Sequence, residues 1–324
     1  MITRRTFGLA AASFGCAGLV SGQAAADNYP SQFIKVVIPN PPAGPGDVIA
    51  RVFTAHATEA IGQSFVFDYR AGASTVIGTQ FAARSAPDGY TILGFPSSGL
   101  AVTLLKKNIP YNLETDFRPI VGLGTVPLAL VVKSSLNFTK FDDFIAALKA
   151  GKMFYGSGGV GTIAHLSGAF LASEFKGSAT HVAFRGNPEA IQGILAGNTD
   201  FAMVSLADAA TVRDTPQAQI LAVTASSRIP SMPNAPTMIE LGYPQFNMRL
   251  WYAFLAPAKT PDDRIKRLYD AFAEAGKKPE LRSQLSSLGF IVDIQDPDTL
   301  VKMMKSEAKQ WSQVIETNHI SVNE

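Results

Sequence analysis

The chain has 324 residues, of which 47% are hydrophobic and 17% are charged. This composition is that of a folded globular protein and excludes disordered, collagen-like and coiled-coil chains. The 28 Lys and Arg residues against 26 Asp and Glu give a net charge of only +2, so we expect no nucleic-acid binding. Cys16 is the only cysteine, which excludes a disulfide framework and a thiolate metal site. The length predicts two domains of ordinary size.

Residues 1–26 have the three parts of a cleavable export signal. Arg4 and Arg5 supply the basic region, a short apolar run follows, and an A-x-A site ends at Ala26. The paired arginines resemble a twin-arginine motif, with an ordinary Sec signal or lipidation at Cys16 as alternatives. Because the signal holds two basic residues and no acid, the mature chain has 26 basic residues, 26 acidic residues and no cysteine. We therefore expect a periplasmic protein, cleaved near Ala26.

Short β-rich runs alternate with helical stretches from residue 33 onward. In chain order we expect strands at 34–38, 64–69 and 90–95, with helices from 47 and over 76–84 and 100–106. A second series has strands at 128–132, 152–156, 180–184, 200–204 and 219–224, with helices at 141–150, 163–174 and 188–196. The C-terminal part has strands at 251–256 and 291–294 and helices at 261–276, 279–288 and 297–316. Such βαβ series favour a parallel sheet with helices on both faces.

The two series predict two lobes. We assign residues 27–125 plus 250–292 to lobe 1 and residues 126–249 plus 293–324 to lobe 2. No Gly/Ser linker separates the series, so the lobes are expected to hinge about a fixed cleft. In α/β sheets ligands bind beyond the carboxyl ends of the strands, which directs attention to the strand-to-helix loops.

Three strand-to-helix loops are rich in Gly, Pro and small hydroxyl residues: 39–47, 96–99 and 156–162. Such loops present backbone donors and hydroxyls to an anion without any basic side chain. Tight turns are the alternative for any one loop, but three at equivalent positions favour cradles for a carboxylate or phosphate. Asp47 is expected to cap the helix after the first loop.

The third loop also fits G-x-G-x-x-G at Gly156, Gly158 and Gly161, which keeps a dinucleotide site open. The next strand ends at Arg185 without the acid that a ribose requires, although Arg can meet a 2′-phosphate. Arg185 fits equally well as the partner of a small carboxylate. His165 either points into the cleft as a neutral donor or supports the loop from behind.

Other catalytic patterns are missing from the sequence. No G-x-S-x-G nucleophile elbow, Walker A or H-E-x-x-H motif occurs, and the histidines show no metal-ligand spacing. Trp251 and Tyr252 are interpreted either as core aromatics or as lining of the cleft, and Arg249 either as a solvated charge or as a second anion contact.

Taken together, these features resemble the Bug receptors, the periplasmic solute-binding proteins of tripartite tricarboxylate transporters. The likeness rests on Tyr29-Pro30-Ser31, Pro41-Pro42-Ala43-Gly44 with Asp47 and Arg51, Arg70-Ala71-Gly72-Ala73, Ala86 to Thr91, Tyr155-Gly156-Ser157, Ala164-His165-Leu166, His181 to Gly186, and Trp251 with Leu255-Ala256-Pro257. The segments occur in order and cover essentially the whole mature chain.

The resemblance implies an α/β, two-lobed type II periplasmic-binding-protein fold with a hinged ligand cleft. Carried over to this chain, its ligand-binding residues are Ala43, Gly44, Asp47, Ser97 and Ser98 in lobe 1 and Ser157, Gly158, Gly161, Thr162, His165, Phe184, Arg185, Gly186 and Ser205 in lobe 2. The chain departs from the family pattern where Ala43 and Pro45 replace glycines and Val204 replaces an aspartate. Absence of an acid at Val204 argues against a ligand ammonium in that corner.

We therefore expect an exported, monomeric, non-catalytic receptor that needs no cofactor or metal. It would capture a small organic acid for the membrane subunits of a tripartite transporter or for a sensor ectodomain. The ligand could be a di- or tricarboxylate, an aromatic acid or an amide. The alternative is an α/β enzyme, either an NADP-binding oxidoreductase that uses the loop at Gly156 or a Ser/His hydrolase.

Overall fold

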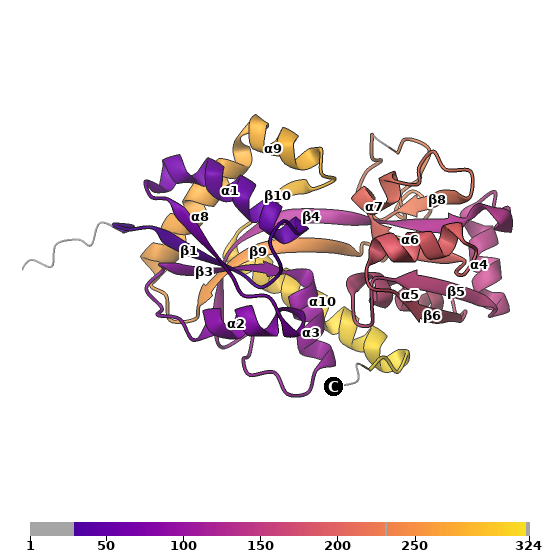
Figure 1. Cartoon of the computed structure of the whole chain (residues 1–324), viewed down its shortest axis with the longest axis horizontal. Coiled ribbons are helices and arrows are strands. Elements are labelled where there is room, and N and C mark those ends of the chain that lie inside the picture. Colours follow the sequence, from indigo (N-terminus) through magenta and orange to yellow (C-terminus); the bar gives the residue numbers. More distant parts are fainter. Residues whose placement is uncertain (1–28, 231, 322–324) are drawn as a thin grey trace, which may run out of the picture.

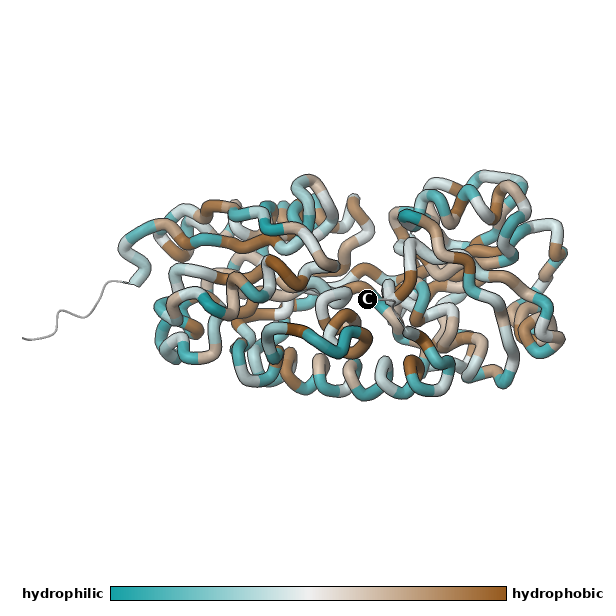
Figure 2. The backbone as a smooth tube through the Cα atoms, turned by 60° about the horizontal axis from the view of Figure 1, so that its bottom comes forward, coloured by the Kyte–Doolittle hydropathy of each residue, from teal (hydrophilic) through white to brown (hydrophobic). Residues whose placement is uncertain are grey.

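The computed structural model describes residues 29–230 and 232–321, which form two α/β lobes joined by two strands and a helix (Figure 1). The predicted export signal, its cleavage after Ala26 and Cys16 lie outside these residues. No helix in the described ranges is long and apolar enough to cross a bilayer. Figure 2 shows the same two bodies from another side, with hydrophobic and hydrophilic residues interleaved along the helices of both.

Lobe 1 is built from the first and last parts of the chain. Its elements are β1 (Ile34–Ile38), α1 (Pro45–Ile61), β2 (Phe65–Tyr69), α2 (Val76–Ala83), β3 (Thr91–Pro96), α3 (Ser97–Leu105), the first part of β4 (Phe117–Lys133), β9 (Arg249–Pro257), α8 (Asp262–Lys277), α9 (Pro279–Ser286) and β10 (Ile291–Gln295). Strand β1 pairs in parallel with β2 and β3, whereas β9 runs antiparallel to β3 and β4. The sheet is therefore mixed, and its parallel part is the part expected from the βαβ pattern.

Lobe 2 follows the end of β4. It holds α4 (Phe141–Ala150), β5 (Met153–Ser157), α5 (Ile163–Glu174), β6 (Ala179–Ala183), α6 (Asn187–Leu195), β7 (Phe201–Ser205), α7 (Leu206–Ala210) and β8 (Ala218–Val223). Strand β5 pairs in parallel with β6 and β7, and β4 pairs antiparallel with β7 and β8. A five-residue α7 was not expected from the sequence.

Strand β4 belongs to both sheets. Its first part pairs with β9 and β10, and its last residues, from Leu128, pair with β7 and β8. The expected strand at 128–132 is thus the end of a 17-residue strand. Gly124, with φ of +142°, pairs with Val292 of β10, and a Cβ at this position would clash with the carbonyl oxygen of Ile291. Only glycine accommodates this irregularity in the strand.

Alternation along the strands builds a core on each face of each sheet. Val36 and Ile38 pack with Phe53 of α1 and with residues of α8, whereas Val37 lies in the cluster on the opposite face. In lobe 2, Leu130 and Val132 face α4 and α5, whereas Val131 faces α6 and α7. This period of two is the signature of a sheet covered on both sides.

Helix α10 (Pro297–Thr317) contributes to both lobes. Leu300 packs in the lobe 1 cluster with Phe95, whereas Trp311 and Val314 pack in the lobe 2 cluster with Phe144. Figure 1 shows this helix running along the side of the molecule from one lobe to the other. The lobe boundaries themselves stay a prediction, and α10 joins lobe 2 only through its second half.

Candidate functional site

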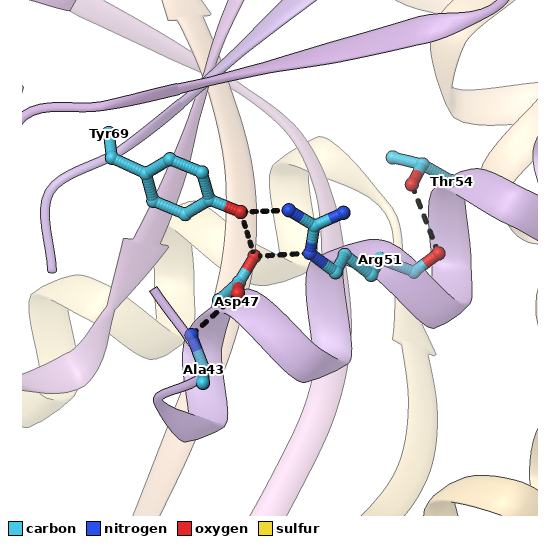
Figure 3. A network of polar contacts seen from close by, with 5 residues as sticks. All are labelled: Ala43, Asp47, Arg51, Thr54 and Tyr69. Atoms are coloured by element: carbon cyan, nitrogen blue, oxygen red, sulfur yellow. Dashed lines mark hydrogen bonds and ion pairs between the residues drawn. The ribbon is translucent and has the colours of Figure 1, made fainter. Parts of the chain in front are cut away.

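The first candidate loop is held by the carboxylate of Asp47, which is only 3% exposed (Figure 3). One carboxylate oxygen accepts a hydrogen bond of 2.8 Å from the Ala43 amide. The other accepts from Arg51 Nε at 2.9 Å and from the Tyr69 hydroxyl at 2.7 Å. Arg51 also donates to the Tyr69 hydroxyl. The carboxylate is thus fully used in fixing the loop, and Ala43 adopts a positive φ of 64°.

This geometry corrects the expectation that Asp47 caps the helix. Helix α1 begins at Pro45, its N-cap residue is Gly44, and Asp47 lies in its first turn. A proline at the start of a helix gives up an amide that would have no intrahelical partner. The amides of Gly46 and Asp47 follow it in the first turn, where backbone donors remain available to an anion.

The second candidate loop passes directly into α3, which begins at Ser97 rather than at the expected residue 100. Ser97 is buried, and its hydroxyl accepts a hydrogen bond of 3.3 Å from the Trp251 amide of β9. Ser98 is half-buried in the first turn of α3. The start of α3 is therefore tied to the strand that connects the lobes.

The third candidate loop, in lobe 2, is organised by its own hydroxyl groups. The Thr162 hydroxyl caps α5 by accepting from the His165 amide at 3.2 Å and donates to the Gly159 carbonyl at 2.8 Å. Ser157 is fully buried and hydrogen-bonds the same carbonyl at 3.0 Å. Its hydroxyl also lies 2.8 Å from Nε2 of His181.

Two histidines stack behind this loop. The ring centroids of His165 and His181 are 3.7 Å apart, and Nδ1 of His165 accepts a hydrogen bond of 3.0 Å from the Gly161 amide. Burial lowers the pKa of both imidazoles to about 4, and the neighbouring His181 adds to the effect on His165. His165 is 5% exposed. Of the two expected roles, the contacts match a neutral histidine that supports the loop from behind.

The loop after β6 carries Phe184, Arg185 and Gly186. The Phe184 ring packs against Gly193 of α6, where a Cβ would lie only 2.6 Å from the ring. Arg185 is exposed, and no described residue accepts a hydrogen bond from its guanidinium group. Gly186 is the N-cap residue of α6. Gly158 packs so closely on Asn187 that a Cβ would lie 2.9 Å from its amide oxygen, which joins this loop to the third candidate loop.

Ser205 ends β7 and caps α7. Its hydroxyl accepts from the Asp208 amide at 3.1 Å and donates to the Asp208 carboxylate at 2.7 Å. Val204, by contrast, is fully buried in the core cluster of lobe 2. The argument against a ligand ammonium considered only position 204, whereas Asp208 supplies a carboxylate nearby. An S-x-x-D capping pattern at residues 205–208 was the signal that could have found it.

Trp251 and Tyr252 of β9 differ in burial. Trp251 is 1% exposed and belongs to the core. Tyr252 is half-buried beneath the first loop, since a Cβ on Gly46 would lie 3.2 Å from its ring. Arg249, at the start of β9, donates to the carbonyl of Asn247 at 3.2 Å.

The enzymatic alternatives receive no support. Ser157 and His181 lie at the distance of a nucleophile and its base. No carboxylate among the described residues hydrogen-bonds the imidazole of His181 or that of His165. An imidazole with a pKa near 4 is also a weak base at neutral pH. No group of three or more His, Cys, Asp or Glu in the described ranges could hold a metal ion.

Two α/β lobes on shared strands, with strand-to-helix loops at the carboxyl ends of the parallel strands, define a two-lobed solute-binding protein of the periplasmic class. Solved structures support this class. One described as a periplasmic transporter matches with a TM-score of 0.75 and 29% identity over 91% of this chain and 100% of its own. MatC from Rhodopseudomonas palustris with bound malate matches with a TM-score of 0.72 and 25% identity over 89% of this chain and 100% of its own. A second R. palustris protein, solved with adipate, matches with a TM-score of 0.75 and 26% identity over 90% and 99%.

Within that class, a profile of the tripartite tricarboxylate transporter family receptors matches residues 49–320, and the chain belongs to this receptor family. The Bug resemblance is confirmed by BugT from Bordetella pertussis, which is 33% identical over 312 residues, 95% of this chain and 94% of BugT. A UPF0065 protein from the tcbD-tcbE intergenic region of Pseudomonas sp. (strain P51) is 33% identical over 302 residues, 92% of this chain and 90% of that protein.

Proposed function

We propose that the chain is an exported receptor that binds a small organic carboxylate between its two lobes. The observation that carries the proposal is the arrangement of helix starts. The starts of α1 and α3 follow β1 and β3 in lobe 1, and those of α5 and α6 follow β5 and β6 in lobe 2. Backbone amides at these starts suit an anion. The malate and adipate in related structures support the ligand class.

Within this site, the lobe 1 contacts would come from the first turns of α1 and α3, near Gly44, Ser97 and Ser98. The lobe 2 contacts would come from the Gly158–Thr162 segment and from Arg185, whose exposed guanidinium group can pair with a carboxylate in bidentate geometry. Asp47, Ser157, His165 and Phe184 would act through the loops that they hold.

The start of α7 in lobe 2 lies near the lobe junction. Gly289 of lobe 1 lies so close to α7 that a Cβ would be 3.5 Å from Leu206. Figure 1 shows α6 and α7 on the side of lobe 2 that faces lobe 1. A ligand held there contacts both lobes and stabilises the closed form, because it binds that form better than the open one.

The test is to express the protein with its signal, recover it from the periplasm, and measure by native mass spectrometry what co-purifies with it. An organic acid should be found, and adding that acid to stripped protein should raise the melting temperature and reduce the radius of gyration. NADPH should do neither. Saturable NADPH binding at micromolar concentration, with no response to any acid, would contradict the proposal.

Export and partners need separate tests. N-terminal sequencing of the periplasmic protein should begin at Asp27, within about two residues. We expect a monomer that engages the membrane subunits of a tripartite transporter or a sensor ectodomain. A full-length cytoplasmic chain as the only binding-competent form would contradict export.

A further inference from the structure

A carboxylate that is only partly used lies at the start of α7. One oxygen of Asp208 accepts hydrogen bonds from the Ser205 hydroxyl at 2.7 Å and from the Asn187 amide at 3.0 Å. No residue within the described ranges donates to the other oxygen, and the side chain is half-buried. Asp208 therefore keeps one acceptor oxygen available while the other is fixed by lobe 2.

Asp208 is joined to the neighbouring loops of lobe 2 through Asn187 at the start of α6, which donates to its carboxylate and packs against Gly158. Burial, with a contribution from the Asp208 carboxylate, raises the pKa of Tyr252 on β9 to about 12. The Tyr252 hydroxyl therefore stays protonated at neutral pH and can act as a hydrogen-bond donor.

Contacts between elements place Tyr252 and the start of α7 at the junction of the lobes. The Tyr252 ring packs on Phe290 at a centroid distance of 6.1 Å. The neighbouring Gly289 lies against the first residues of α7. On its other side, Tyr252 lies beneath Gly46 in the first turn of α1. Tyr252 thus lies by the first turn of α1, and the start of α7, which carries Asp208, lies against the lobe 1 segment next to Phe290.

The chemistry of the Asp208 carboxylate limits which ligand groups it can bind. An ionised carboxylate only accepts hydrogen bonds, so its open oxygen requires a donor. A second carboxylate at that position would be repelled, and the repulsion is stronger in a partly dry cleft than in water. A hydroxyl, an ammonium or an amide N–H satisfies the open oxygen.

We propose that Asp208 determines ligand specificity by selecting organic acids that carry a hydrogen-bond-donating group at the end that reaches α7. The inference rests on the proposed function, because it assumes a carboxylate held at the other helix starts. Hydroxy acids, amino acids and acid amides belong to the selected class, and bare dicarboxylates of equal length do not.

The test compares probes that differ by one donor. Succinate, malate and aspartate share a four-carbon skeleton with no added donor, a hydroxyl and an ammonium, and benzoate and 4-hydroxybenzoate form an aromatic pair. Titration calorimetry on stripped wild-type protein should show at least one donor-bearing acid binding about 10-fold or more tightly than its bare counterpart, as a charge-assisted hydrogen bond provides.

The variant Asp208→Asn makes the test sharper. Its amide oxygen can keep the bonds from Ser205 and Asn187, so its NH₂ group takes the place of the open oxygen. The preference should then disappear or reverse toward the bare acid. Asp208→Glu should retain the preference of the wild type. Asp214→Asn, which removes a carboxylate with an 81% exposed side chain from the same lobe, should leave the ratio unchanged.

The outcomes separate the two proposals. If bare acids bind as tightly as their donor-bearing counterparts, the role of Asp208 is overturned and the carboxylate receptor stands. If Asp208→Asn has the affinity ratio and the melting temperature of the wild type, the role of Asp208 is likewise overturned. If none of the acids binds and the co-purifying ligand is not an acid, both proposals fall.

Discussion

The Trp251 indole nitrogen donates a hydrogen bond of 2.6 Å to the Glu307 carboxylate. The other oxygen of Glu307 accepts from the indole of Trp311 at 2.9 Å, and these are the two tryptophans of the chain. Trp251 lies on β9, which connects the lobes, and Trp311 lies in the core of lobe 2. Because the Trp251 amide also donates to Ser97, one carboxylate links the candidate site, the connecting strand and lobe 2.

Glu307→Gln should destabilise the protein and change its tryptophan emission. An amide offers one oxygen where the carboxylate offers two, so one indole N–H would face an NH₂ group and lose its acceptor. Loss of a buried hydrogen-bond partner costs about 1–3 kcal/mol. Urea unfolding followed by fluorescence measures the loss. Glu316→Gln, on an exposed position of the same helix, should match the wild type. Equal stability of both variants would contradict a stabilising role for the Glu307 hydrogen bonds.

Asp47→Asn should loosen the first loop. The substitution removes the charge from a carboxylate that takes three donors, and charge-assisted hydrogen bonds are worth about 1.5–3 kcal/mol each. We expect a lower melting temperature and faster amide exchange at Ala43. The control is Asp68→Asn, which removes only a partly exposed ion pair with Arg70 and should cost less than about 1 kcal/mol. Protection of the Ala43 amide that survives in Asp47→Asn would contradict the assigned role.

Stability should fall as the pH falls from about 6.5 to about 4. Burial lowers the pKa of His165 and His181 to about 4 in the folded protein, so the unfolded chain binds more protons in this window. Stability therefore rises with pH there and is fully present above the unfolded value. Below about 4 both states are protonated and this contribution is lost.

The double substitution His165→Asn and His181→Asn should flatten this part of the pH–stability curve, measured by urea unfolding at several pH values. His319→Asn, on an exposed residue, serves as the control. A curve that keeps its slope in the double variant but loses it in the control would show that the stacked pair is not its source.

Arg185→Ala should weaken binding of the co-purifying acid roughly 10- to 150-fold, which corresponds to one charge-assisted contact of about 1.5–3 kcal/mol. Arg185→Lys should show an affinity between those of the wild type and Arg185→Ala, since the charge remains and the bidentate geometry is lost. Arg249→Ala is the comparison and should have a far smaller effect. If calorimetry shows the loss for Arg249→Ala and none for Arg185→Ala, the anion contact lies elsewhere.

The sequence allowed most helices and strands to be predicted because their hydrophobic periods are regular. Strand β4 was the main exception, since Pro119, Gly122 and Gly124 interrupt the pattern between Phe117 and Val126. The structure tolerates them because the register with β9 shifts at Pro119/Val121 and at Gly122/Gly124. Irregularities of this kind depend on the partner strands, which no local pattern reveals.

The candidate loops were predictable as loops, but not the side chains behind them. The role of Asp47 depends on Tyr69, which is 22 residues away and comes from the neighbouring strand β2. His181 appeared unrelated to His165 in the sequence, yet parallel pairing of β5 with β6 places it opposite Tyr155 and beside the loop. Asp208 lies in a helix too short to give a periodic signal.

The pairing of Pro127 with Arg249 has a consequence for how such receptors diversify. Paired residues on antiparallel strands lie about 4.5–5.5 Å apart, so the segment 128–248 leaves and rejoins lobe 1 at one point. A contiguous stretch of gene therefore encodes the lobe 2 loops of the proposed binding site. Exchange of that stretch between two homologues, with Trp311 and its surroundings matched, should give a chimaera that folds. Recombination at the two codons that encode this residue pair would then create a receptor with lobe 1 from one parent and lobe 2 from the other.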